Sequence, residues 1–91
     1  MTERRAYRIT GTVQGVGFRW WTRKTASALN IRGFVRNARD GSVEVEAEGS
    51  EADLDAFEER LRQGPAGARV RGFQEREPGR DRLPTGFEIV R

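Results

Sequence analysis

The chain has 91 residues, of which 35% are hydrophobic, and a net charge of +3, so we expect a single compact domain over residues 1–91. It contains no cysteine and no histidine, which excludes disulfides and thiolate-bound metals and removes the commonest general base. Residues 1–5 form no apolar signal stretch and no run approaches about 18 apolar residues, so we expect a cytoplasmic protein without a membrane partner.

The first third of the chain predicts a strand, a glycine-rich turn and a helix. Residues 6–13 alternate between apolar and polar side chains, which is the pattern of a half-buried strand. Residues 14–17 include two glycines, and residues 18–29 then carry apolar side chains at helical spacing. Asn30 is expected to end this helix, because asparagine tolerates the left-handed conformation common there.

The middle of the chain predicts a hairpin. Residues 33–37 and 42–48 form two short strands, and Asp40 and Gly41 mark the turn between them. The second of these strands alternates strictly, with valine and alanine on the inner side. Its outer side carries three glutamates, which we interpret as an acidic surface rather than a metal cluster: Glu44, Glu46 and Glu48.

The remainder predicts a second helix and two more strands. Ser50 is followed three residues later by an acid, which is typical of a helix start, and Gly64 with the proline after it ends this helix. Residues 68–75 predict a strand with a bulge near Gly72. After a polar loop, residues 86–90 predict a last short strand.

This order of elements indicates an α+β fold of the ferredoxin-like type. It is a βαββαβ sandwich with two helices on one face of a mostly antiparallel sheet, plus an extra C-terminal strand. Apolar periodicity alone cannot assign both neighbouring tryptophans on the first helix. We expect Trp21 to lie in the core and Trp20 to flank a site.

A glycine-rich turn between a strand and a helix is suited to binding an anion. Gly15 and Gly17 would let the backbone N–H groups and the positive end of the helix dipole converge, and Arg19 would add a planar fork of donors. The spacing fits neither the dinucleotide nor the triphosphate template, so the turn would hold one phosphate group. From spacing alone, a simple tight turn followed by a solvated Arg19 remains an equal alternative.

Two motifs in this sequence resemble the signatures of the acylphosphatase family. Residues 9–19, ITGTVQGVGFR, match the first signature without a break, and residues 33–37, GFVRN, followed by Gly41, Val43 and Gly49, match the second. The similarity continues through residues 64–70 and 86–89, and so spans nearly the whole chain.

The resemblance implies a metal-independent enzyme without a cofactor that hydrolyses acyl phosphates to a carboxylate and inorganic phosphate. It implies that phosphate, or sulfate in its place, binds to the loop and its arginine: Gln14, Gly15, Val16, Gly17, Phe18 and Arg19. Arg19 and Asn37 would be the catalytic residues, with Asn37 holding the attacking water. Without the motif, Asn37 would be interpreted as an ordinary turn residue. A monomer is the default expectation.

Two other functions share this fold. A non-catalytic acylphosphatase-like domain, such as the one that opens larger hydrogenase-maturation proteins, would bind anions without turnover. An RNA-binding module would also fit the basic charge, but such modules stack bases on aromatic side chains of the central strands. The three glutamates predicted there would repel a phosphate backbone, so we expect no nucleic-acid partner.

Overall fold

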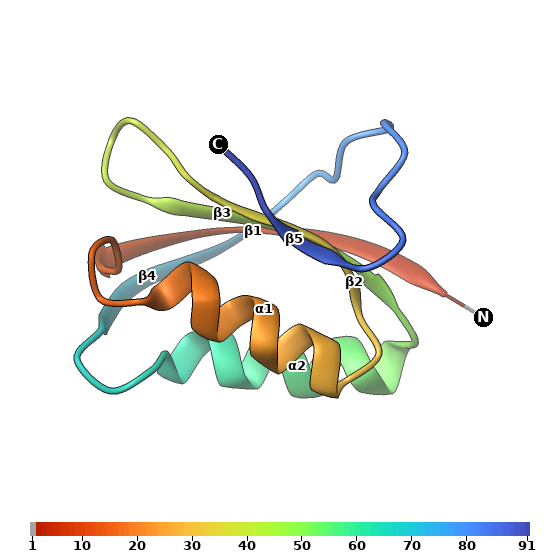
Figure 1. Cartoon of the computed structure of the whole chain (residues 1–91), viewed down its shortest axis with the longest axis horizontal. Coiled ribbons are helices and arrows are strands. Elements are labelled where there is room, and N and C mark those ends of the chain that lie inside the picture. The colour runs from red at the N-terminus through yellow and green to blue at the C-terminus, as the bar shows by residue number, and fades with distance from the viewer. Residues whose placement is uncertain (1) are drawn as a thin grey trace.

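The computed structural model describes residues 2–91 and contains one five-stranded sheet and two helices. In chain order the elements are β1 (Glu3–Thr12), α1 (Phe18–Ala28), β2 (Arg32–Asn37), β3 (Val43–Gly49), α2 (Glu51–Gln63), β4 (Arg69–Arg76) and β5 (Phe87–Ile89). The strands lie in the order β4-β1-β3-β2-β5; β5 pairs parallel with β2, and the other three pairings are antiparallel. Both helices cover the same face of the sheet (Figure 1). The predicted ferredoxin-like fold with an extra strand is confirmed.

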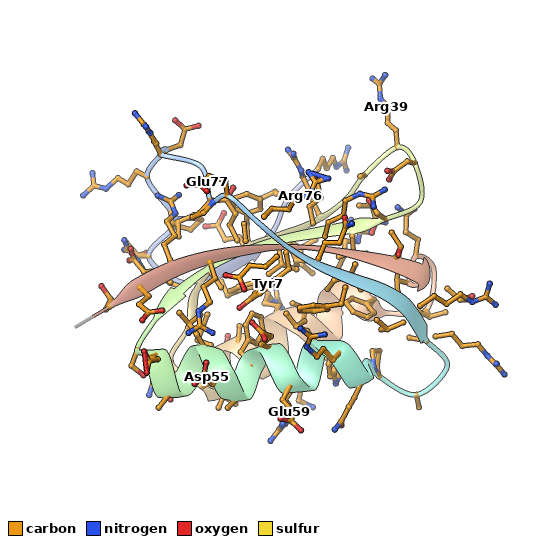
Figure 2. The ribbon with its side chains drawn as sticks, turned by 180° about the vertical axis from the view of Figure 1, so that it is seen from behind. Tyr7, Arg39, Asp55, Glu59, Arg76 and Glu77 are labelled. Atoms are coloured by element: carbon orange, nitrogen blue, oxygen red, sulfur yellow. The ribbon has the colours of Figure 1, made fainter. Side chains whose placement is uncertain are left out.

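The core lies between the sheet and the helices. Alternation along β1 directs Tyr7 and Ile9 into it, and α2 contributes Leu54, Phe57 and Leu61 from one side of the helix. Figure 2 shows Tyr7 between the sheet and α2, whereas Arg76 and Glu77 lie on the other side of the sheet. Complete burial of one such large apolar side chain stabilises the fold by about 1.5–3 kcal/mol.

Most of the predicted element ends are confirmed. Asn30 has φ 57, in the left-handed region, just after α1. The Ser50 hydroxyl accepts a hydrogen bond from the Asp53 N–H at 3.1 Å and caps α2, which Gly64 terminates. The bulge is also present: Thr10 pairs with Gly72 and the next residue of β1 pairs with Val70, which leaves Arg71 unpaired.

The sheet face opposite the helices differs from the acidic surface that the sequence predicted. Each glutamate of β3 forms an ion pair with an arginine of a neighbouring strand: Glu44 with Arg36, Glu46 with Arg4, and Glu48 with Arg32. Three carboxylates on one strand face remain charged at low cost when cations from adjacent strands lie beside them. In the described strands β1 and β3 this face carries arginine, alanine, threonine and glutamate but no aromatic ring, and Phe34 of β2, paired with Glu46, is the aromatic residue beside them. One ring next to three carboxylates gives an RNA-binding function no support.

The segment between β4 and β5 covers part of this second face. The Gly79 N–H donates to a carboxylate oxygen of Glu46 at 3.1 Å, and the Arg4 guanidinium donates to the carbonyl oxygen of Asp81. Leu83 is only 4% exposed, although the sequence predicted nothing but a polar loop here. No helix in residues 2–91 is both long and apolar enough to span a bilayer.

Candidate functional site

A pocket of about 170 Å³ opens where the β1–α1 loop meets the ends of β2 and β5. Its walls come from Val13, Gly15, Gly17, Phe18, Arg19, Trp20, Asn37 and Ile89. A single bound water needs about 10–15 Å³ of such space, so the pocket has room for an anion of several atoms. The structure thus brings the two glycines, Arg19 and Asn37 to one place.

The two loop glycines are required by their backbone conformation. Gly15 and Gly17 have φ values of 77 and 74. Residues other than glycine adopt such positive φ values only at a cost in free energy. A Cβ atom at either position would meet no protein atom within 4 Å. The space above the loop is therefore open, and the polar groups of the loop backbone border a free volume.

The N-terminus of α1 lies at this pocket without a cap from any side chain. Gly17 occupies the N-cap position, no side chain hydrogen-bonds there, and the first turn contains no acidic residue. The first N–H groups of a helix have no partner within the helix, and they carry the positive end of its dipole. This end of α1 can therefore donate to an anion.

Arg19 is the one charged residue that lines the pocket. Its side chain is half-buried, and among residues 2–91 no carboxylate lies within ion-pair distance of it. Guanidinium groups bind two oxygens of a phosphate or carboxylate at once. An arginine without an ion-pair partner in residues 2–91, beside N–H groups that have no partner within the helix, gives the pocket a positive charge.

Asn37 reaches the pocket from the end of β2. Its Oδ1 atom is buried and has no hydrogen-bond partner among the described residues. A buried acceptor left without a donor costs about 1–3 kcal/mol, so this oxygen is available to a donor that enters with a ligand. Ile89 lies nearby because β5 pairs with β2, placing Ile89 beside Val35, two residues before Asn37.

Three residues of the predicted phosphate loop have supporting rather than pocket-facing side chains. The Gln14 amide donates to the carbonyl oxygens of Ala38 and Ser42, at 2.8 and 2.9 Å, and so connects the loop to the turn after Asn37. Val16 packs against the core. Phe18 is buried and contacts the ring of Trp21, although one part of it borders the pocket.

The turn that Gln14 binds is itself held by Asp40. The hydroxyl and the N–H of Ser42 donate to Asp40 at 2.6 and 3.0 Å, and Arg8 pairs with the same carboxylate. These hydrogen bonds from Ser42, together with Arg8, hold the pKa of Asp40 well below its usual range. Asp40 is therefore ionised at neutral pH, and its hydrogen bonds with Ser42 stabilise the turn between β2 and β3.

Two residues of the pocket were not among the predicted site residues. Val13 and Ile89 line the pocket, and Ile89 reaches it only through the parallel pairing of β5 with β2. No local pattern in a three-residue strand such as β5 signals which distant loop it will face.

The expectation for the tryptophans is confirmed: Trp20 is exposed at the pocket and Trp21 packs against the core.

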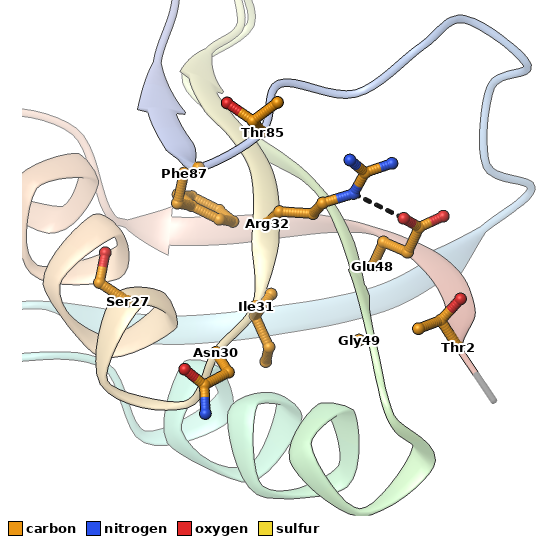
Figure 3. A pocket seen from close by; sticks show the side chains of 10 residues that line it. Thr2, Ser27, Asn30, Ile31, Arg32, Glu48, Gly49, Thr85 and Phe87 are labelled. Carbon is orange, nitrogen blue, oxygen red and sulfur yellow. Dashed lines mark hydrogen bonds and ion pairs between the residues drawn. The ribbon is translucent and has the colours of Figure 1, made fainter.

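A larger cavity of about 450 Å³ lies elsewhere, beside the C-terminal end of α1 (Figure 3). Its two charged residues, Arg32 and Glu48, are paired with each other at 2.6 Å and offer no free charge to a ligand. No group of three or more histidine, cysteine, aspartate or glutamate residues within residues 2–91 is arranged to hold a metal ion. The smaller pocket is therefore the better candidate site.

Comparisons with known proteins point to one family. A profile of the acylphosphatase family matches residues 5–89. A curated acylphosphatase from Rhizobium etli is 48% identical over 83 residues, which cover 91% of this chain and 88% of the relative. The crystal structure of acylphosphatase from Bacillus subtilis matches with a TM-score of 0.90 and 33% identity over 100% of both chains. Full-length HypF in a phosphate- and nucleotide-bound form matches with a TM-score of 0.82 and 31% identity, covering 99% of this chain but 12% of that one.

Proposed function

The chain belongs to the acylphosphatase family and is an acylphosphatase by homology; from this premise we propose how its residues divide the work. The β1–α1 loop and Arg19 bind the phosphate group of an acyl phosphate, and Asn37 orients the attacking water. The observation that carries this proposal is the meeting of an uncapped helix N-terminus, an unpaired arginine and an unpartnered amide oxygen in one pocket.

The reaction needs little from the protein beyond binding and orientation. Water attacks phosphorus, the bond from phosphorus to the acyl oxygen breaks, and a carboxylate leaves. The conjugate acid of that carboxylate has a pKa near 4, as for a glutamate or aspartate side chain, so the leaving group departs without a proton. A site without histidine is therefore adequate, and no metal ion enters the proposed mechanism.

Arg19 and the loop N–H groups would meet the charge on the phosphate oxygens that do not react. Such preorganised donors stabilise the transition state because they are already oriented when the charge develops. Asn37 can orient water through its amide, but at neutral pH it cannot take a proton. The proton of the water is transferred to the phosphate itself, so that the products are a carboxylate and dihydrogen phosphate.

The alternative of a non-catalytic anion-binding domain is distinguished from this proposal by turnover. The match to HypF keeps the alternative relevant, because there the similar region is a small part of a much longer chain. Anion binding alone does not separate the two hypotheses, since both predict it. Release of carboxylate from an acyl phosphate does.

The test is hydrolysis of acetyl phosphate and benzoyl phosphate by the wild type, Arg19→Gln and Asn37→Ala, each with a metal chelator present. We expect chelator-insensitive turnover by the wild type and a loss of about 10²- to 10³-fold in kcat for each variant, the size usual for one preorganised group. Arg23→Gln, a change of the same kind at an exposed position on α1 outside the pocket, is the matched control and should retain activity.

Circular dichroism and the unfolding midpoint establish that each variant is folded. Hydrolysis at the wild-type rate by folded Arg19→Gln or folded Asn37→Ala would show that the roles are assigned wrongly. Loss of activity with chelator, restored by a divalent metal, would contradict the metal-free mechanism.

A further inference from the structure

Two large apolar side chains are conspicuously exposed, and both belong to the pocket. Trp20 is 57% exposed and Ile89 is 36% exposed. Both line the same cavity as Arg19 and Asn37. Single exposed apolar residues are common on protein surfaces, but two from distant elements beside one polar site mark a surface adapted to an apolar group.

The two side chains reach the pocket by independent routes. Trp20 is in the first turn of α1, directly after Arg19, so its position follows that of the arginine. Ile89 is in β5, whose pairing with β2 sets it beside Val35. The ammonium group of Lys24, one helical turn after Trp20, lies 5.2 Å from the centroid of the indole ring, a contact that favours one orientation of the ring.

We infer that Trp20 and Ile89 bind the acyl group of the substrate and make the enzyme prefer aromatic or bulky apolar acyl phosphates. This inference rests on the proposed function, because it needs the phosphate to be held at Arg19. The acyl carbon is joined to phosphorus through a single bridging oxygen, so it must lie at the mouth of the phosphate site. The residues beyond Arg19 and Asn37 on that mouth include Trp20 and Ile89.

The chemistry of this rim favours a flat apolar acyl group. The face of an indole ring and a branched aliphatic side chain both contact an aromatic ring well through apolar atoms. A methyl group, as in acetyl phosphate, buries little area against them, whereas a phenyl ring buries much more. Contacts to a part of the substrate that does not react still raise kcat/KM, because they persist in the transition state.

The experiment compares kcat/KM for benzoyl phosphate and for acetyl phosphate in the wild type, Trp20→Ala, Trp20→Phe and Ile89→Ala. The quantity of interest is the ratio of the two values. We expect Trp20→Ala to lower the ratio about ten-fold, as loss of one aromatic contact would, and Ile89→Ala to lower it by a smaller factor. Trp20→Phe keeps an aromatic face and should restore most of the ratio.

Leu29→Ala is the matched control, because Leu29 is a half-buried apolar residue just beyond the far end of α1 and lies outside the pocket. Its ratio should equal that of the wild type. An unchanged ratio in Trp20→Ala, or an equal fall for both substrates, would overturn the inference while leaving the proposed function intact. Absence of turnover with either substrate in the wild type would instead overturn the proposed function itself.

Discussion

At the scale of single residues, the positive charge of the pocket depends on what surrounds Arg19. Eight ion pairs occupy arginines elsewhere in residues 2–91, and Arg19 takes part in none of them. A carboxylate next to it would neutralise the site and compete with the ligand. Gly17 complements the arginine, because its left-handed backbone starts α1 with no side chain over the free N–H groups.

This role of Gly17 gives a prediction for Gly17→Ala. The left-handed conformation costs alanine about 1 kcal/mol, so we expect a small loss of stability. Relaxation of the loop would turn the N–H groups away from the ligand. Misplacing such groups by about 1 Å lowers the rate by up to about 10²-fold. Chemical denaturation measures the first effect, and kcat/KM for acetyl phosphate the second.

Gly67 provides the matched control. It also has a positive φ, 89, with no atom within 4 Å of an added Cβ, but it does not line the pocket. Gly67→Ala should lose a similar amount of stability and keep its activity. If both variants lose activity equally, the effect of Gly17→Ala is one of general stability and not of loop geometry.

At the scale of elements, the two helices differ in how their ends are capped and charged. α2 has the Ser50 cap, acidic residues in its first turn and arginines in its last turn, which together offset its dipole. α1 has none of these features. The helix that contributes to the pocket is therefore the one whose N-terminus the protein leaves unsatisfied, and an anion is the natural partner for it.

The Ser50 cap predicts a purely structural effect for Ser50→Ala. Loss of the hydrogen bond to the Asp53 N–H should lower the free energy of unfolding by about 1 kcal/mol. Since α2 contributes no residue to the pocket, kcat and KM should remain at their wild-type values. Urea denaturation and steady-state kinetics on the same preparation test both parts, and a changed KM would link α2 to the site.

How far the sequence predicts such elements depends on the range of the interactions involved. The ends at Asn30, Ser50 and Gly64 were predicted because each follows from the chemistry of one residue and its near neighbours. β1 begins at Glu3, three residues before the predicted start, because pairing with β3 extends it across from Gly49. Strand pairing of this kind joins distant residues and leaves no local pattern.

The same limit applies to the candidate site and to the charged surface. Family motifs identified Arg19 and Asn37, and the structure brings them into one pocket, whereas Ile89 could be found only from the sheet. The ion pairs of the β3 glutamates were not predicted, for the same reason. Their partners Arg4 and Arg32 lie far from them in sequence, and only the pairing of three strands brings them together.

At the scale of the whole molecule, different kinds of interaction stabilise the two faces of the sheet. Apolar packing against the helices stabilises one face. The other face carries ion pairs between strands and is partly covered by the segment after β4. Exposed ion pairs contribute little individually, although linked pairs contribute more. The stability of the protein should therefore depend on pH mainly through its carboxylates.

Asp40 allows this dependence to be tested with Asp40→Asn. Because the native pKa of Asp40 lies below its unfolded value of about 3.9, the ionised carboxylate stabilises the fold fully above about pH 5. That stabilisation declines as the pH falls below about 4 towards the native pKa. Wild type should exceed Asp40→Asn in free energy of unfolding by a constant amount at about pH 7 and 5, and by less at about pH 3.

Asp81→Asn is the control for this series, because the Asp81 carboxylate is exposed and forms no ion pair within residues 2–91. Its urea midpoints should follow those of the wild type at each pH. A difference between wild type and Asp40→Asn that stays the same down to about pH 3 would show that the charge of Asp40 does not provide the stabilisation.

The two hydrogen bonds from the Gln14 amide have a consequence for catalysis. They join the loop that would receive the electrophile to the residue directly after Asn37, which would present the nucleophile. If the proposed roles hold, this one side chain, with both N–H donors of its amide engaged, connects the binding site of the electrophile to that of the nucleophile. Such a link would help to keep the attacking water in line with phosphorus, because a displacement of the loop would be transmitted to the turn.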